Sequence, residues 1–426
     1  MPETAGEAPA PPTRFDAILL IPTTATARLG GLSLVERAAF TMARAGAHRL
    51  LCLGVRPEGA LRLPPVPISW VAGTDEPALA AWSTGAAGVI VAMDATTVVD
   101  RDTVTALVAA PQAGCLQASG PGLLWRCESA ALPALVRAAT KSVAREPSAQ
   151  CSRRVGAPAL PGASSWMLPP GALFARAGDA PGRAAVERAL YSRLGRPGES
   201  WFNRVIDRRI SRVLTWLLLP TGVTPNQITS TSIGIGIVAG LLFATGNQRV
   251  EVAGALLFLL STIIDGCDGE IARLTFRESR LGARLDLAGD NAVHLFLFGG
   301  IAAGLHRRSP EGGFATLGGV LVAGVVLAMA VVYLSFVRRR PTRAQRALFE
   351  TFASREFSYL LVVLTLAGKL EWFLWVAAAG TYAFVAGLLV LGKRSRPASP
   401  RETPATDSRA RRPARGEAER GRSRDS

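Results

Sequence analysis

The chain has 426 residues, enough for two or three domains, and it combines 49% hydrophobic residues with a formal net charge of +16, as membrane proteins with basic cytoplasmic segments do. Its basic residues are not interleaved with aromatic ones as a base-stacking surface requires, which disfavours a nucleic-acid-binding protein. Five cysteines without a CxxC spacing and three dispersed histidines disfavour a disulfide framework, a zinc site and a histidine-rich metal site.

The first part of the chain, residues 14–185, has the pattern of an α/β domain. Apolar runs at 15–21, 49–55 and 88–94 predict buried strands, and the amphipathic run at 32–47 predicts a helix. Strands that alternate with helices are typical of a parallel sheet, so we predict a parallel α/β sheet for this domain.

Three segments lack a regular pattern. Residues 1–13 form a Pro/Ala-rich lead without the charged and apolar regions of a signal peptide, so we expect a disordered lead and a first domain that stays in the cytoplasm. Residues 140–185, rich in Pro, Gly, Ala and Ser, fit either a linker or an irregular extension of the domain, and we favour the extension. Residues 393–426 are an Arg/Pro/Ser-rich tail that we expect to be disordered.

The remainder has the composition of a membrane domain. Residues 186–225 form a juxtamembrane region in which 201–220 mixes arginines with tryptophans and aliphatic residues, as helices that lie in the membrane interface do. A spanning helix needs about 20 residues, and six apolar stretches within 226–392 predict an all-α domain of six transmembrane helices. The expected spans are 226–246, 250–273, 283–305, 314–337, 347–368 and 372–392.

The charges that flank these spans predict an orientation. Six crossings put both termini on one side, and that side would hold most of the flanking arginines and lysines. The opposite side would hold only Arg249, Arg307, Arg308 and Lys369. Because cytoplasmic segments carry the excess of positive charge, we expect a multi-pass protein of the cell membrane with both termini in the cytoplasm.

Four aspartates stand where the second and third expected spans meet the cytoplasmic surface. Asp265 and Asp268 are three residues apart, and Gly282, Asp286 and Asp290 repeat every four residues, so each set shares one helix face. A connection of about ten residues makes the two helices antiparallel neighbours. Four adjacent anions repel one another, and oxygen-liganded divalent cations relieve that repulsion. Two such helices could hold a pair of ions about 3.5–4 Å apart, as in phosphoryl-transfer sites.

Two other interpretations of this cluster remain open at this point. The aspartates could pair with the neighbouring arginines in a solvated loop. They could also belong to a cation transporter, although a transporter places its carboxylates near the bilayer midplane, facing an alternating pathway. The spacing here places them close to one membrane face and on adjacent helices.

The residues around the aspartates form an extended motif. Its pattern is D-x-x-D-G-x-x-A-R, eight residues, then G-x-x-x-D-x-x-x-D, and it resembles the signature of the CDP-alcohol phosphotransferase (CDP-alcohol phosphatidyltransferase) family. The resemblance covers roughly residues 200–392 and includes the stretch TPNQIT at 224–229. The matched positions are Asp265, Asp268, Gly269, Ala272, Arg273, Gly282, Asp286 and Asp290.

The resemblance implies an activity and a role for each matched residue. In such enzymes an acceptor hydroxyl attacks a CDP-alcohol and CMP leaves, on the cytoplasmic side of the membrane. Asp265, Asp268 and Asp286 would hold two Mg²⁺ or Mn²⁺ ions, and Asp290, also near a metal, would be the catalytic base. The resemblance also implies contact with membrane lipids and a homodimer. The nucleotide-binding residues would be Gly269, Ala272, Arg273 and Gly282.

A second charged position lies at the start of the fifth expected span. Arg355 resembles a residue that binds an anionic group of the acceptor in family members with phosphorylated acceptors. The alternative is an arginine that snorkels to the interface and pairs with a carboxylate on its own helix. We interpret Arg208, Arg209 and Arg338–Arg340 as topology and lipid-headgroup residues.

The α/β domain adds a further resemblance. The chain is similar to family members fused to an N-terminal nucleotidyltransferase domain, of the inositol-1-phosphate cytidylyltransferase and di-myo-inositol phosphate phosphate synthase type. Such domains need a Gly-rich loop ending in Arg, followed by Lys, whereas the stretch PTTATARLGG has Arg28 with no glycine before it and no lysine nearby. Asp94 fits either a metal aspartate or a plain strand end. We therefore expect a degenerate domain, the alternative being a bifunctional enzyme that also makes CDP-inositol.

Overall fold

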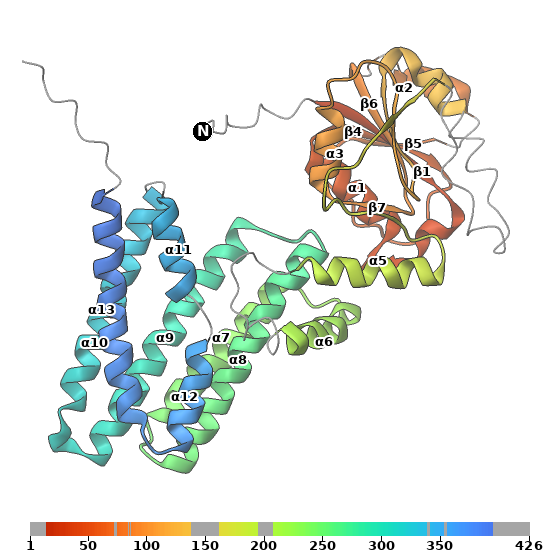
Figure 1. Ribbon diagram of the computed structural model, residues 1–426. Coiled ribbons are helices and arrows are strands. Elements are labelled where there is room, and N and C mark those ends of the chain that lie inside the picture. Colours follow the sequence, from red (N-terminus) through yellow and green to blue (C-terminus); the bar gives the residue numbers. More distant parts are fainter. Residues whose placement is uncertain are drawn as a thin grey trace, which may run out of the picture.

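The chain folds into an α/β domain followed by a helical bundle, and the first domain lies beyond one end of the bundle (Figure 1). In this computed structural model the expected lead, residues 1–13, and most of the expected tail lie outside the described residues. The described residues are 14–71, 75–83, 85, 87–137, 162–194, 208–338, 341–352 and 356–394.

Strand β1 (Phe15–Ile21) lies inside a seven-stranded sheet with the order β10-β8-β9-β6-β1-β4-β5. β4 (Ala47–Gly54) and β6 (Val89–Asp94) pair with it in parallel on its two sides, and β5 (Ile68–Val71) extends the sheet beyond β4. All of β1 is buried, as its almost entirely apolar sequence requires of a strand covered on both faces. β1, β4 and β6 correspond to the strands predicted at 15–21, 49–55 and 88–94, and these three predictions are confirmed.

The sheet is mixed, so the prediction of a parallel sheet was wrong in one region. β9 (Leu124–Glu128) runs antiparallel to both β6 and β8 (Leu116–Ala118). Residues 119–123, which join β8 to β9, are too few for the crossover that a parallel pair needs. β10 (Ser164–Trp166) then pairs in parallel with β8 at the sheet edge.

Helix α1 (Leu34–Ala45) packs against the sheet and confirms the amphipathic helix expected over 32–47. A capping box fixes its start: Ser33 Oγ accepts from the Glu36 amide at 3.2 Å, and Glu36 Oε2 accepts from the Ser33 amide at 2.7 Å. The other elements of this domain are the 3-10 turns at Thr23–Thr26 and Ser129–Ala131, the hairpin β2 (Arg28–Leu29) and β3 (Leu32–Ser33), α2 (Glu76–Ser83), β7 (Thr97–Val99), α3 (Arg101–Val108), β11 (Phe174–Arg176) and α5 (Ala180–Ser192).

Helix α5 belongs to the first domain. Val186 is buried in a cluster with Leu29, Val98 and Leu173, and Leu190 packs against the same cluster. The expected domain boundary at residue 185 therefore falls inside a helix whose apolar face covers the α/β domain. Of the extension expected over 140–185, the described residues 162–185 contribute Leu173 and Ala177 to this cluster, and residues 140–161 lie outside the described residues.

Asp100 ties α3 to the end of this extension. Its carboxylate accepts hydrogen bonds from the Thr103 amide at 2.9 Å, the Leu173 amide at 2.8 Å and Arg193 Nη1 at 2.7 Å. Burial raises the pKa of Asp100, but these hydrogen bonds outweigh burial, and the pKa lies below its ordinary value of 3.8. A lowered folded-state pKa stabilises the fold at neutral pH, and that contribution is lost as the pH falls from 3.8 through the lowered value.

We expect Asp100→Ala to destabilise the first domain by about 1–2 kcal/mol at pH 7, because it removes a helix cap. The loss should shrink in acid, where the wild-type carboxyl becomes protonated. Thermal unfolding of wild type and variant at pH 7 and at pH 3 measures both effects. Asp102→Ala, at an exposed position of the same first turn, is the control, and an equal loss in both variants would contradict the assignment.

The bundle follows, and four of its described helices are long and apolar enough to cross a membrane: Pro225–Phe243, Gln248–Leu274, Phe314–Phe336 and Leu370–Gly392. A further helix of 29 residues carries the second pair of aspartates and several more charges. In chain order the helices are α6 (Arg208–Leu218), α7 (Pro225–Phe243), α8 (Gln248–Leu274), α9 (Arg280–Arg308), α10 (Phe314–Val332) with a π-helical end at Tyr333–Arg338, α11 (Arg343–Phe352), α12 (Glu356–Leu366) and α13 (Leu370–Arg394).

The expected fifth span, 347–368, differs from the structure. Two helices occupy this range, α11 and α12, and residues 353–355 between them lie outside the described residues. α11 packs on α13, whereas α12 packs on both α8 and α13. The charged and aromatic residues of α11 recur with a helical period, so α11 is amphipathic, whereas α12 is mainly apolar.

Helices α7 and α9 touch through glycine. A methyl group on Gly300 would lie 2.0 Å from the Gly240 carbonyl oxygen, and one on Gly304 would lie 2.1 Å from the Phe243 carbonyl oxygen. Small residues at such positions let two backbones approach closely, which is how membrane helices pack. This contact fixes α9, and hence its aspartates, relative to α7.

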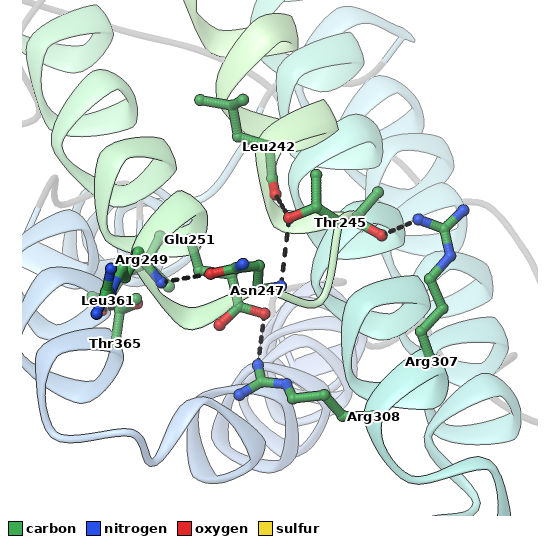
Figure 2. Close-up of polar contacts among 10 residues, drawn as sticks. Leu242, Thr245, Asn247, Arg249, Glu251, Arg307, Arg308, Leu361 and Thr365 are labelled. Atoms are coloured by element: carbon green, nitrogen blue, oxygen red, sulfur yellow. Dashed lines mark hydrogen bonds and ion pairs between the residues drawn. The ribbon is translucent and has the colours of Figure 1, made fainter.

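The turn between α7 and α8 is held at the other end of the bundle (Figure 2). Asn247 Oδ1 caps α8 by accepting from the Arg249 amide at 3.0 Å. Arg308, at the end of α9, pairs with the buried carboxylate of Glu251, and Arg307 donates to the Ala244 carbonyl. These contacts tie the three helices together at the end farthest from the first domain.

Candidate metal centre

The aspartates meet between α8 and α9. Carboxylate oxygens of Asp265, Asp286 and Asp290 all lie within 4.8 Å of one another. Two of the three side chains are half-buried and Asp290 is exposed, so the group is open to ligands. The stripe expected from the four-residue spacing on α9 therefore faces Asp265 on α8.

Asp268 stands beside this group. Its carboxylate accepts a hydrogen bond from the buried hydroxyl of Thr229 on α7, and it lies close enough to Asp265 and Asp286 for their charges to interact. Thr229 thereby orients one of the four carboxylates. The structure thus brings together all four aspartates singled out from sequence.

Two hydroxyl groups of α7 were missed by the sequence reasoning. Besides Thr229, Ser232 places its Oγ 3.4 Å from Asp265 Oδ1. Ser261 on α8 donates to the Ser232 carbonyl at 2.7 Å and so joins the two helices beneath the site. Thr229 and Ser232 are three residues apart and therefore share one face of α7, and Thr229 is the last residue of the motif TPNQIT. This spacing is the signal from which both hydroxyl groups could have been predicted.

The glycine positions of the motif allow close approach. A methyl group on Gly282 would lie 2.9 Å from Asn226 Oδ1 and 3.0 Å from Ser279 Oγ, so a larger residue would displace these two side chains. Gly269 faces the guanidinium of Arg273, with 3.3 Å between Nη1 and the position of a methyl group. Arg273 Nη2 also donates to the Leu194 carbonyl of the first domain at 3.5 Å. Ala272 is half-buried between these residues on α8.

The donor set fits divalent cations with a preference for oxygen. Four carboxylates on two rigid helices supply hard oxygen ligands and the negative charge that Mg²⁺ or Mn²⁺ neutralises. The glycine contacts between α7 and α9 hold the helix that carries Asp286 and Asp290 in place relative to α7.

Helix α6 is anchored beside the motif. Glu270, buried on the opposite face of α8, accepts from Ser211 Oγ and Thr215 Oγ1, each at 2.9 Å. The outer face of α6 exposes Ile210, Val213, Trp216 and Leu217. An exposed apolar stripe with an anchored polar face is typical of a helix that lies in the membrane interface, as expected for 201–220.

The remaining predicted site residues fall elsewhere. Arg355 lies outside the described residues, and so does the side chain of Arg208. In the first domain, Asp94 Oδ1 accepts from the Thr96 amide at 2.7 Å and from its hydroxyl at 2.9 Å. Arg28 is exposed in β2, at the start of a hairpin.

The comparisons with known proteins show the family to which the helical part of the chain belongs. Residues 222–391 match the profile of a family described as CDP-alcohol phosphatidyltransferase. A phosphatidylinositol phosphate synthase of Corynebacterium glutamicum is 30% identical over 188 residues, which cover 42% of this chain and 81% of that protein. The chain therefore belongs to the CDP-alcohol phosphatidyltransferase family.

Other relatives combine two activities in their names. The bifunctional IPC transferase and DIPP synthase of Thermococcus kodakarensis is 40% identical over 96 residues, 22% of this chain and 21% of that protein. The protein of the same name from Archaeoglobus fulgidus is 34% identical over 142 residues, 33% of this chain and 27% of that protein. The match thus spans about a quarter of the length of these relatives.

A phosphatidylinositol phosphate synthase of Mycobacterium tuberculosis, in complex with manganese and citrate, aligns with a TM-score of 0.34 and 17% identity, covering 42% of this chain and 88% of that chain.

Proposed function

We propose that the protein transfers a phospho-alcohol group from a CDP-alcohol to an acceptor hydroxyl and releases CMP. The observation that carries this proposal is the convergence of Asp265, Asp286 and Asp290 from two helices, with Asp268 beside them. Membership of the CDP-alcohol phosphatidyltransferase family supports the same reaction class.

The proposed chemistry assigns one task to each group. Asp265, Asp268 and Asp286 would hold divalent ions, proposed to be a pair of Mg²⁺ or Mn²⁺, which neutralise the diphosphate and the charge on the leaving CMP. Asp290 accepts the proton of the acceptor hydroxyl. The hydroxyl oxygen then bonds to the phosphorus distal to cytidine, and the bond from that phosphorus to the bridging oxygen breaks, releasing CMP.

The substrates are proposed to be of the inositol-phosphate type. Phosphatidylinositol phosphate synthase and archaetidylinositol phosphate synthase are the names of two relatives, and both refer to an inositol phosphate joined to a lipid. A phosphorylated acceptor needs a cationic partner, and Arg355 is proposed for that role. Gly269, Ala272, Arg273 and Gly282 are proposed to contact the nucleotide, because they stand within a few residues of the carboxylates along α8 and α9.

The first domain is proposed to be a nucleotidyltransferase-like domain without cytidylyltransferase activity. Its glycines, Gly30 and Gly31, follow Arg28 and form the turn of the β2–β3 hairpin, with φ angles of 55° and 81°. In this place they shape a turn and supply no amides before the arginine to cradle a triphosphate. Because two relatives are named as bifunctional proteins, cytidylyltransferase activity of the first domain is the alternative to be tested.

The proposed placement is a multi-pass protein of the cell membrane with its termini and aspartates on the cytoplasmic side. The four apolar helices and the exposed apolar face of α6 support membrane insertion. A homodimer with lipid contacts is proposed from the family resemblance.

CMP release by the detergent-purified protein tests the proposed function. Donors such as CDP-inositol and CDP-diacylglycerol would be combined with inositol, inositol phosphate and lipid acceptors, with and without Mg²⁺. The expected result is CMP release that requires a donor, an acceptor and the metal. If the CDP-alcohol donor were consumed when no acceptor is present, the protein would hydrolyse the donor, and this result would contradict group transfer. CDP-inositol formation from CTP and inositol 1-phosphate would show that the first domain is active.

A further inference from the structure

The short connection between the two aspartate-bearing helices has an unusual backbone. α8 ends at Leu274 and α9 begins at Arg280, so the loop is residues 275–279, shorter than expected from sequence. Among the residues that the structure describes, Phe276 is the one non-glycine residue with a positive φ, at 54°. A bulky residue adopts that conformation only where its surroundings impose it.

The first domain supplies those surroundings. The Phe276 ring stacks on Phe40 of α1 with 5.4 Å between ring centroids and 10° between planes. The guanidinium carbons of Arg37 and Arg44, also on α1, lie 5.7 Å and 5.8 Å from the same ring centroid. Stacking and cation–π contacts therefore hold the ring from one helix of the other domain.

Arginines of the first domain also hold the backbone of this loop. Arg62 forks across two successive carbonyls: Nη1 donates to Thr275 at 2.5 Å and Nη2 donates to Phe276 at 2.9 Å. Arg37 Nη2 donates to the Leu274 carbonyl at 2.9 Å. The last carbonyls of a helix have no partner within it and carry its negative dipole end, so cationic donors fit them well.

Two further contacts complete the junction. Arg44 pairs with Glu278 at 2.6 Å. The turn at Gly30 and Gly31 packs against the end of α8, because a methyl group on Gly31 would lie 3.3 Å from Thr275 Cγ2. The hairpin that replaces the expected nucleotide loop is thus part of the surface that contacts the membrane domain.

The geometry connects this junction to the metal centre. Asp268 precedes the end of α8 by six residues, and Asp286 follows the start of α9 by six, so each lies about 9 Å along its helix from the loop. Because the loop is short and both helices are rigid, its conformation influences the separation of the two aspartate pairs.

We propose that Arg62 and Phe276 are positioning residues, through which the first domain fixes the loop between α8 and α9 and thereby the separation of the two aspartate pairs. The proposal gives the first domain a task that requires no nucleotide chemistry of its own, and it rests on the proposed function. Neither residue touches the carboxylates, so both act through the backbone of the loop.

The test compares Arg62→Ala with Arg56→Ala in the full-length protein. Arg56 is a matched control, since it is an exposed arginine of the same domain whose guanidinium carbon lies 5.7 Å from the Trp70 ring centroid. Mn²⁺ binding followed by electron paramagnetic resonance is the first measurement, and the kcat and KM of CMP release are the second. We expect Arg62→Ala to weaken Mn²⁺ binding about tenfold and to lower kcat by a similar factor, as the loss of a supporting contact around a metal site does. Arg56→Ala should match wild type in both.

A variant at Phe276 tests the contact of its ring with the first domain without disturbing the backbone conformation of the loop. Phe276→Gly permits the positive φ without steric cost but removes the ring. Phe276→Gly should weaken Mn²⁺ binding and lower kcat as Arg62→Ala does. Phe276→Tyr keeps a ring that can stack on Phe40, so it should bind Mn²⁺ as wild type does. Wild-type Mn²⁺ binding and kcat in both Arg62→Ala and Phe276→Gly would overturn the inference. A wild-type protein that binds Mn²⁺ but releases no CMP would instead contradict the proposed function, and the Mn²⁺ measurements would still decide the positioning role.

Discussion

Asp290→Asn is expected to reduce the kcat of CMP release by about 10³-fold, within the range that a positioned general base contributes. The amide has nearly the same shape as the carboxylate but cannot accept the acceptor's proton at neutral pH. Asp290 is exposed at the open side of the cluster, so the substitution should leave the fold intact. Steady-state kinetics in saturating Mg²⁺, with thermal unfolding measured on the same samples, gives the result.

Two companion variants sharpen this experiment. Asp286→Asn removes a proposed ligand and should weaken Mn²⁺ binding more than Asp290→Asn does. Glu311→Gln makes the same chemical change at an exposed position in the turn before α10 and should have no effect. If Asp290→Asn retained most of the wild-type kcat, Asp290 would not be the base.

Gly300→Val is expected to push α9 away from α7, to lower the thermal stability of the bundle and to reduce CMP release. The first carbon of the new side chain would lie 2.0 Å from the Gly240 carbonyl oxygen, a distance that no rotamer change relieves. Overpacking a tight contact costs about 1–3 kcal/mol or more, and here the obstacle is backbone. The midpoint of thermal unfolding in detergent should fall by several degrees, as about 2 kcal/mol does in a domain of this size.

The neighbouring residue provides the control. No atom lies within 4 Å of a methyl group placed on Gly299, so Gly299→Val changes the same residue type one position away without a clash. We expect its unfolding midpoint and CMP release to match wild type. Equal destabilisation by both variants would mean that the cost comes from valine in the helix and not from contact with α7.

The aspartate cluster could be predicted from sequence because its geometry is local. The three-residue spacing of Asp265 and Asp268 and the four-residue spacing of Asp286 and Asp290 each fix a helix face. A short connection then forces the two helices to be neighbours. For the same reason the buried strand β1 and the capped helix α1 were predictable from their own residues.

Features that depend on distant partners were not predictable. Arg62 contacts Thr275, a residue more than two hundred positions away, and nothing in the sequence around either one signals the pair. The antiparallel strand β9 was missed because its direction depends on a short connection and not on its own composition. The boundary at 185 was misplaced because the apolar face of α5, marked by Val186, matches a surface made by other segments.

One titration would show whether the protein transfers a phospho-alcohol group to an acceptor and needs a divalent ion to do so. CMP release would be measured with CDP-diacylglycerol and with CDP-inositol, at increasing Mg²⁺, with and without inositol phosphate as acceptor. We expect CMP release from at least one donor to rise with Mg²⁺, to require the acceptor and to equal the amount of phosphodiester product formed. CMP release that continues unchanged after all divalent ions have been chelated, or without any acceptor, would contradict it.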